Sequence, residues 1–211
     1  MNATDTVLKT GTTTVGIVCK DGIVLAADKR ATAGYIANKN VRKVIQITSH
    51  QAITTAGNVS DIQLLGKLIQ AEVQLKDMQV HRPATSREVA HLLAGMLYQN
   101  IRRFSVIPGI AAFLLGGFDH EGPKLFELSP DGAIMEAEDY AADGSGSVFA
   151  LGVLETLFKK GMTINEGIAV ATKAVNAAIQ RDMMSGNGIT IMTITSEGVK
   201  TVVDRSIETN L

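Results

Sequence analysis

Short apolar segments bounded by turn residues alternate along the chain with longer segments of helical periodicity. Residues 12–19 are rich in β-branched side chains, and the Lys20-Asp21-Gly22 turn that follows them favours a hairpin with residues 23–27. Residues 44–48 and 52–56 have the same strand-forming character. We therefore predict two pairs of strands in the amino-terminal part of the chain.

Two helical patterns follow these strands. Apolar residues recur at helical spacing between positions 62 and 73, with Ser60 as the expected N-cap and Pro83 beyond the end of the helix. In the second pattern, Thr85 and Glu88 have the spacing of a capping box, and apolar residues continue to about position 101. A pair of helices is thus expected after the first strands.

The second half of the chain repeats the order of strands, two helices and strands. The expected strands are residues 110–118, 125–128, 133–137, 189–195 and 199–203, and the expected helices are residues 147–158 and a segment capped by Thr163 and Glu166 that ends near Arg181. Because the strands come as hairpins and not singly between helices, a doubly wound parallel sheet is disfavoured. We predict an α+β fold of four layers (αββα), in which helix pairs flank two stacked antiparallel sheets.

Length and composition indicate one folded unit. At about 150 residues per domain, 211 residues make one large domain or two very small ones. Residues 1–11 are polar and lack the apolar segment of a secretory signal, so we expect a leader followed by a single domain of residues 12–211. Apolar residues make up 45% and charged residues 19% of the chain, which is typical of a folded globular protein.

Charge and residue types disfavour several classes of partner. Lys and Arg together number 20 against 21 Asp and Glu, which argues against nucleic-acid binding. The single cysteine, Cys19, excludes an internal disulfide and a multi-cysteine metal site. The longest apolar run, residues 106–118, is too short to span a bilayer. We expect a cytoplasmic protein without a metal, nucleic-acid or membrane partner.

Motifs for cofactor binding and for histidine-dependent catalysis are missing from the sequence. The chain contains no P-loop, dinucleotide fingerprint, HExxH, EF-hand or G-x-S-x-G pattern, so we expect no cofactor. Its four histidines, His50, His81, His91 and His120, stand in unrelated contexts. A Ser-His-Asp enzyme is therefore not indicated.

The junction between Gly11 and Thr12 joins the polar leader directly to a Thr-rich strand. If the leader were removed, Thr12 would carry a hydroxyl and a free α-amine on adjacent carbons. A threonine hydroxyl needs a base to act as a nucleophile, and an α-amine with a pKa of about 7.7–8.0 suits that task at neutral pH. The alternative is that Thr12 merely begins an edge strand, and composition alone favours this alternative.

Seven ordered motifs change this balance: TTTVG at 12–16, GIVLAADKRAT at 22–32, NKNVRKVIQI at 38–47, TAG at 55–57, GSGS at 144–147, GVLE at 152–155 and RDMMSG at 181–186. Together they resemble the proteasome β subunits, which are N-terminal nucleophile hydrolases. The resemblance extends from Thr12 to about Val203 and is to the catalytic, archaeal type.

The resemblance implies a role for each matching residue. Thr12 would be the nucleophile and its own amine the base, Lys43 a positive charge beside the hydroxyl, and Asp28 the partner that orients Lys43. Gly57 would donate its backbone N–H to the oxyanion. Ser145, Asp182 and Ser185 match the residues that surround the amino terminus. The structural alternatives are a solvated Lys43 within the basic cluster of residues 39–43, a strand-end cap at Asp28, a turn glycine at Gly57, and loop or cap residues for the other three.

The resemblance also implies a substrate pocket beside Thr12. The matching positions are Ala31, Thr32, Val41, Ile45, Thr55 and Val59, and none of them is acidic or basic. We therefore expect cleavage after apolar residues.

Processing and assembly follow from the resemblance as well. It implies autocatalytic cleavage between Gly11 and Thr12, seven-membered β rings stacked between rings of α subunits, an ATP-dependent unfoldase on the α rings, and unfolded proteins as substrates. Three alternatives stay open: an HslV-like threonine peptidase, a catalytically silent structural β subunit, and an amidohydrolase for small amides.

Overall fold

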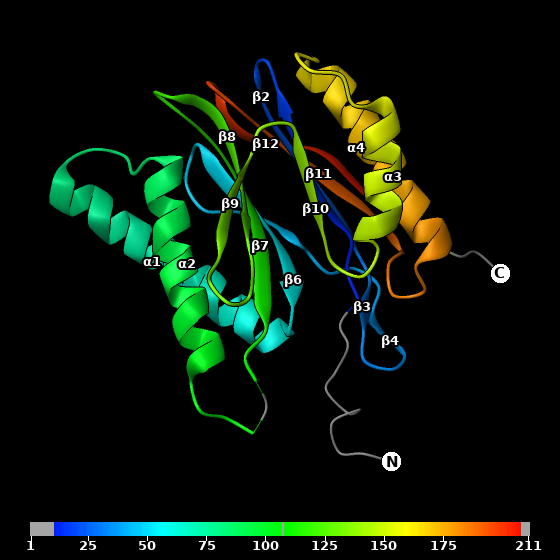
Figure 1. Cartoon of the computed structure of the whole chain (residues 1–211), viewed down its shortest axis with the longest axis horizontal. Coiled ribbons are helices and arrows are strands. Elements are labelled where there is room, and N and C mark those ends of the chain that lie inside the picture. The colour runs from blue at the N-terminus through cyan, green and yellow to red at the C-terminus, as the bar shows by residue number, and fades with distance from the viewer. Residues whose placement is uncertain (1–10, 107, 208–211) are drawn as a thin grey trace.

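Two five-stranded antiparallel sheets form the centre of the structure, a computed structural model that describes residues 11–106 and 108–207 (Figure 1). The first sheet has the strand order β10-β1-β2-β11-β12, and the second has the order β5-β6-β7-β8-β9. The strands of the first sheet are β1 (Thr14–Cys19), β2 (Gly22–Asp28), β10 (Tyr140–Asp143), β11 (Gly188–Thr195) and β12 (Gly198–Ser206). Those of the second are β5 (Val44–Gln46), β6 (Gln51–Gly57), β7 (Ala111–Asp119), β8 (Gly122–Leu128) and β9 (Ile134–Ala137).

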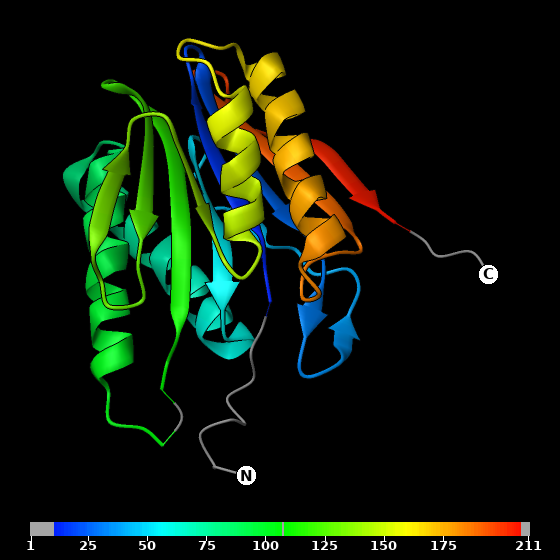
Figure 2. The same cartoon turned by 45° about the vertical axis from the view of Figure 1, so that its right-hand side comes forward.

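A pair of helices covers the outer face of each sheet (Figure 2). Helices α1 (Val59–Val80) and α2 (Ser86–Arg102) pack on the second sheet, and α3 (Ser147–Leu157) and α4 (Ile164–Arg181) pack on the first. The predicted αββα arrangement is thereby confirmed. Within the described ranges, no helix is both long and apolar enough to cross a membrane.

Strand periodicity supplies three apolar interfaces between the four layers. Along β7, Phe113 and Leu115 face α1 and α2, whereas Leu114 between them faces the other sheet. The two sheets approach closely where they carry glycine, because a Cβ on Gly16 would lie 2.7 Å from Leu125 Cδ1 and one on Gly116 would lie 2.8 Å from Ile23 Cγ2.

Local capping signals set the starts of α2 and α4. The capping boxes predicted at Thr85 and Thr163 are both present. The expected N-cap of α1, Ser60, is wrong: the helix begins at Val59 with Asn58 as N-cap, and Ser60 lies inside its first turn. Asn58 directly follows the end of β6, and its extended backbone (φ −69°, ψ 130°) turns the chain into the helix.

Three short strands have no counterpart among the predicted elements. Strands β3 (Ala31–Thr32) and β4 (Ile36–Asn38) form a separate two-stranded hairpin, and β10 pairs with β1. Neither strand of the hairpin has enough apolar residues to give an alternating pattern. Strand β10 contains two alanines and Asp143, so its extended form depends on pairing with β1 and not on local propensity.

Candidate active site

Residues far apart in the sequence meet at one end of the sandwich, around the peptide bond between Gly11 and Thr12. Thr12 stands two residues before β1, Asp28 is the last residue of β2, Lys43 directly precedes β5, and Gly57 ends β6. The antiparallel pairing of β1 with β2 places Asp28 beside the start of the chain's first strand, where its backbone N–H donates to the Thr13 carbonyl at 3.1 Å.

Two polar hydrogens converge on the carbonyl oxygen of Gly11. The Thr12 hydroxyl donates to this oxygen at 2.8 Å, and Lys43 Nζ donates to it at 3.1 Å. All three residues are buried, so the interaction is shielded from water. The carbonyl that precedes Thr12 is thus polarised, with the Thr12 hydroxyl oxygen beside it.

Asp28 holds Lys43 by a buried ion pair. Lys43 Nζ lies 2.7 Å from Asp28 Oδ1, and their side chains are 5% and 0% exposed, respectively. The same carboxylate accepts backbone N–H groups from Thr13 at 3.0 Å, Arg30 at 3.0 Å and Gly186 at 2.9 Å. Burial lowers the pKa of Lys43, and its ion pair and hydrogen bond with Asp28 act in the opposite direction.

The alternatives for these two residues are decided by burial. A solvated Lys43 is wrong, because the residue is 4% exposed while Lys39 and Arg42 of the same basic cluster lie on the surface. Asp28 does bind backbone groups at the end of its strand, and in addition it pairs with Lys43.

Two hydroxyl groups and one carboxylate form a hydrogen-bonded cluster that reaches the Thr12 nitrogen through Ser145. Ser145, two residues before α3, and Ser185, between α4 and β11, both donate to Asp182 Oδ2, at 2.7 and 2.6 Å. The Thr12 N–H points to Ser145 Oγ at 3.2 Å. Burial alone would raise the pKa of Asp182, but hydrogen bonds from Ser145, Ser185 and the Met184 N–H outweigh it and lower the pKa.

Gly57, at the end of β6, lines the pocket that opens beside Thr12. Its backbone has a φ of +118°, and a Cβ at this position would lie 2.3 Å from the Ile110 carbonyl oxygen. Only glycine therefore fits without displacing the neighbouring strand. Gly57 and Thr12 line one pocket.

A pocket opens beside Thr12, and five of the six positions expected to bind substrate line it: Ala31, Val41, Ile45, Thr55 and Val59. The sixth residue expected to bind substrate, Thr32, is not among the lining residues; its hydroxyl accepts the Gly11 N–H at 3.0 Å. Two basic residues outside the expected set, Arg42 and Lys43, also line the pocket. Lys43 belongs to the buried ion pair, and Arg42 is an exposed side chain.

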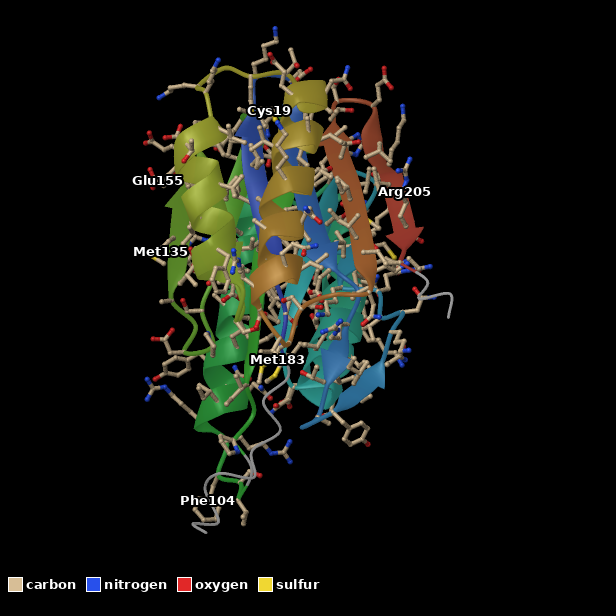
Figure 3. The ribbon with its side chains drawn as sticks, turned by 90° about the vertical axis from the view of Figure 1, so that its right-hand side faces the viewer. Cys19, Phe104, Met135, Glu155, Met183 and Arg205 are labelled. Carbon is tan, nitrogen blue, oxygen red and sulfur yellow. The ribbon has the colours of Figure 1, made fainter. Side chains whose placement is uncertain are left out.

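Two neighbouring residues that were not among the predicted site residues support this arrangement. Thr13 binds both Asp28 and Ser185. Arg30 donates to Asn187 Oδ1 at 2.7 Å and to the Met183 carbonyl at 2.8 Å, which braces the loop between α4 and β11. Figure 3 labels Met183 at this end of the molecule, below α4. Both residues lie inside the motifs at 12–16 and 22–32, which are the signal that could have identified them.

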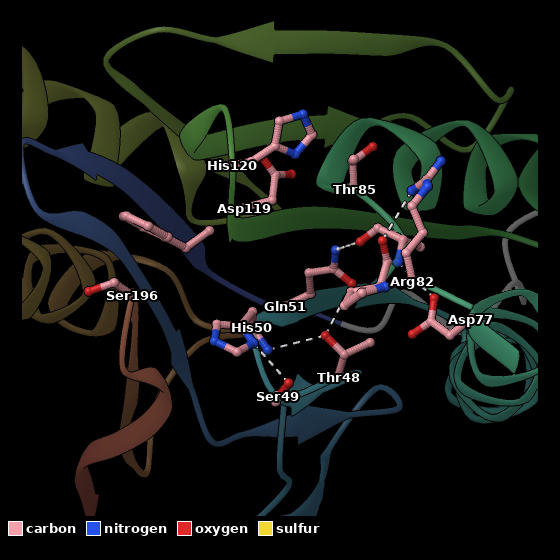
Figure 4. A pocket seen from close by; sticks show the side chains of 13 residues that line it. Thr48, Ser49, His50, Gln51, Asp77, Arg82, Thr85, Asp119, His120 and Ser196 are labelled. Carbon is pink, nitrogen blue, oxygen red and sulfur yellow. Dashed lines mark hydrogen bonds between the residues drawn. The ribbon is translucent and has the colours of Figure 1, made fainter. Parts of the chain in front are cut away.

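A larger pocket lies at the opposite end of the sandwich (Figure 4). Strand β6 joins the two ends, since Gln51 lines this pocket and Gly57 lies beside Thr12. The carboxylates here brace turns: Asp77 accepts the Ala84 N–H at 2.7 Å, and Asp119 accepts the Ser86 N–H at 2.7 Å. In the described part of the chain, no group of three or more His, Cys, Asp or Glu side chains could hold a metal ion.

Comparison with known proteins agrees with this geometry. A family model described as "Proteasome subunit" matches residues 8–194. The chain is 40% identical over 203 residues to "Proteasome subunit beta" of Methanopyrus kandleri, covering 95% of each protein. It is 44% identical over 200 residues to the protein of that name from Methanococcus maripaludis strain C5, covering 94% of this chain and 90% of the relative. It is also 44% identical over 201 residues to "Proteasome subunit beta 1" of Thermococcus gammatolerans, covering 95% of this chain and 96% of the relative. The chain therefore belongs to the proteasome subunit family, a peptidase family whose members assemble with other subunits into the proteasome core.

Proposed function

We propose that this chain is a catalytic β subunit and a threonine endopeptidase, which hydrolyses peptide bonds of unfolded proteins. Thr12 is the nucleophile after removal of residues 1–11 has made it the amino-terminal residue. The observation that carries this proposal is the convergence of the Thr12 hydroxyl and Lys43 Nζ on the Gly11 carbonyl oxygen, at 2.8 and 3.1 Å. Of the leader itself, residues 1–10 lie outside the described residues.

Removal of the leader is the first reaction. Thr12 Oγ1 attacks the Gly11 carbonyl carbon while Lys43 stabilises the negative charge that develops on the carbonyl oxygen. The hydroxyl proton passes to the Thr12 nitrogen as the C–N bond breaks, which leaves an ester between Gly11 and Thr12 Oγ1. Water then hydrolyses this ester, giving a Gly11 carboxylate and a free amine on Thr12.

The released amine is the base for turnover. Its ordinary pKa of about 7.7–8.0 suits proton transfer at neutral pH, and it accepts the proton of Thr12 Oγ1 through a water molecule. Lys43, oriented by Asp28, supplies the positive charge that lowers the amine pKa and favours the alkoxide. Attack on a substrate peptide bond forms an ester at Oγ1 and releases the carboxyl-side peptide as an amine, and water then hydrolyses the ester.

Gly57 and the hydroxyl groups around Asp182 complete the proposed machinery. The Gly57 N–H donates to the oxyanion, an interaction whose loss typically costs ~3 kcal/mol of transition-state stabilisation. Ser145, Asp182 and Ser185 hold the Thr12 amine in place. The short hydrogen bonds among them, 2.6–2.7 Å, support this assignment.

The pocket supports cleavage after apolar residues. Its wall of Ala31, Val41, Ile45, Thr55 and Val59 offers mainly methyl and methylene groups to the side chain before the cut. Arg42 contributes an exposed positive charge to the same pocket, so substrates with an acidic residue before the cut form the second class to be tested.

The proposal includes the particle in which the subunit works. Seven-membered β rings stack between rings of α subunits, an ATP-dependent unfoldase docks on the α rings, and the assembly acts in the cytoplasm. Exposed apolar side chains along one face of α1 support burial by other subunits: Leu64, Leu68, Leu75 and Met78 are 53%, 42%, 51% and 62% exposed.

Co-expression of the chain with its α subunit tests the proposal. The wild-type chain should lose residues 1–11 by intact mass and cleave a fluorogenic peptide with an apolar residue before the cut, in preference to acidic and basic peptides. Thr12→Ala should assemble, retain the leader and hydrolyse nothing, whereas Thr14→Val, in the same segment, should behave as the wild type does. Activity in Thr12→Ala, or in chains that still begin at Met1, would reject the mechanism. An assembled wild-type chain without cleavage or activity would identify a structural subunit.

A further inference from the structure

Thr13 contacts both groups of polar side chains that surround Thr12. Its N–H donates to Asp28 Oδ1 at 3.0 Å, and its Oγ1 lies 2.7 Å from Ser185 Oγ. The residue is 0% exposed. Gly146 leaves the space for this hydroxyl, because a Cβ on Gly146 would lie 2.0 Å from Thr13 Oγ1. The hydroxyl thus occupies a closely fitted position with Ser185 as its hydrogen-bond partner.

The number of protons sets the direction of the hydrogen bonds between these residues. A carboxylate only accepts, and each hydroxyl has one proton to donate. Ser145 and Ser185 both lie within 2.7 Å of Asp182 Oδ2, closer than the 3.3 Å from Ser145 Oγ to the Thr12 carbonyl oxygen, so both direct their protons to the carboxylate. Ser185 Oγ must therefore accept from Thr13, and Ser145 Oγ accepts from the Thr12 nitrogen at 3.2 Å. Two donor chains converge on Asp182, and Thr13 begins one of them.

We propose that Thr13 is a positioning residue, whose hydroxyl keeps Ser185 and Asp182 in the arrangement in which Ser145 accepts an N–H from Thr12. This inference rests on the proposed function, in which the Thr12 nitrogen is the catalytic base. When one N–H of the amine is bound to Ser145, rotation of the amine is restricted. Its lone pair is then available to the proton of Thr12 Oγ1.

The charged groups near this nitrogen come from several elements. They are Asp28 at the end of β2, Arg30 after it, Lys43 before β5, Asp143 at the end of β10 and Asp182 after α4. Thr13 is uncharged, so its replacement by valine changes hydrogen bonding without changing the number of charges. Without the Thr13 hydroxyl, Ser185 no longer accepts a hydrogen bond and becomes a weaker donor to Asp182. The negative charge of Asp182 is then less dispersed, which favours the ammonium form of the Thr12 amine.

The expected result is a change in the pH profile together with a lower kcat. In Thr13→Val, the acidic limb of kcat/KM should move to higher pH by about half to one unit, the size of one neutral hydrogen bond. At pH 7 kcat should fall about tenfold. KM for an apolar fluorogenic peptide should be unchanged, because Thr13 is not among the residues that line the substrate pocket.

The test compares assembled particles that carry Thr13→Val, Thr13→Ser or Thr14→Val. Thr13→Ser keeps the hydroxyl and should restore the wild-type profile. Thr14→Val is the matched control, since Thr14 is 1% exposed and its hydroxyl donates to the Asp143 carbonyl at 3.2 Å, outside the Asp182 network. If Thr13→Val does not assemble, Thr13→Ala removes the same hydroxyl and is measured instead.

Two outcomes would overturn the proposal. One is a wild-type pH profile and kcat in the variant without the hydroxyl, and the other is an equal loss in Thr13→Ser, which would assign the effect to packing of the methyl group. Failure of the proposed function is distinct from both, because wild-type particles would then show no activity that Thr12→Ala abolishes.

Discussion

Replacing Asp28 by asparagine removes the negative charge that faces Lys43 inside the molecule. The carboxylate accepts four donors, with Thr13 N–H and Lys43 Nζ on Oδ1 and the N–H groups of Arg30 and Gly186 on Oδ2. An amide has an NH2 group in place of one oxygen, so two of these donors lose their acceptor in either orientation. Because a buried ion left without its partner costs about 3–5 kcal/mol, we expect the free energy of unfolding to fall by this amount at pH 7.

The loss in stability should depend on pH through Lys43. Burial holds the pKa of Lys43 below its ordinary value of 10.5, and removal of Asp28 lowers it further. A lysine whose pKa is lower in the folded state binds fewer protons there than in the unfolded chain, so stability rises with pH up to the unfolded value. The difference in free energy of unfolding between wild type and Asp28→Asn is therefore largest near pH 7. It shrinks as the pH approaches 10, because Lys43 then loses its charge in the unfolded chain as well.

Urea unfolding of the isolated chain between pH 7 and 10 measures this difference, with Thr12→Ala in both backgrounds to prevent cleavage of the leader. Glu136→Gln is the control, because Glu136 forms ion pairs of similar length with Lys124 and with Arg87, both 2.8 Å, and its side chain is 32% exposed. Loss of each of these solvent-exposed pairs should cost about 0.2–1 kcal/mol. A loss below about 1 kcal/mol for Asp28→Asn at pH 7, or one that stays constant up to pH 10, would refute the reasoning.

Three further predictions concern Gly11, Gly57 and Asp182. A Cβ on Gly11 would lie 1.7 Å from Met184 Cβ, so Gly11→Ala should slow release of residues 1–11 in an intact-mass time course. The control is Gly95→Ala, which should process at the wild-type rate because a Cβ there would have nothing within 4 Å. Equal rates for both variants would contradict the prediction. Gly57→Ala should lower the free energy of unfolding by about 1–3 kcal/mol in urea titrations, because φ there is +118°; an unchanged midpoint would show that the strand adjusts. Hydrogen bonds hold the pKa of Asp182 below its ordinary value of 3.8, so its contribution to stability is present above that pH and is lost as the pH falls through the folded-state pKa. Asp182→Asn should therefore lower the melting temperature at pH 7 and lose this difference in acid, and a difference that persists there would point to packing.

Much of the fold was predictable because it depends on neighbours in the sequence. The capping boxes at Thr85 and Thr163 join residues three positions apart, and hairpin turns join strands that are adjacent in the chain. The alternation of Phe113, Leu114 and Leu115 between two cores follows from strand periodicity alone. The junction of Gly11 with Thr12 is also a local feature, but it indicated a nucleophile only together with the seven ordered motifs that resemble the proteasome β subunits.

Tertiary structure decided the rest, because these features depend on partners far away in the chain. Strand β10 is extended through pairing with β1, and Asn58, the residue before α1, donates its backbone N–H to the Ile110 carbonyl at 2.8 Å. Ser145 lies 133 residues from Thr12 and Asp28 lies 158 residues from Gly186, yet each pair is joined by a hydrogen bond. By itself, the sequence determined which segments become strands and helices and which residue types are available for chemistry. Burial of Lys43 with Asp28 and the direction of hydrogen bonds toward Asp182 arise only when the packed layers exclude water and bring these segments together.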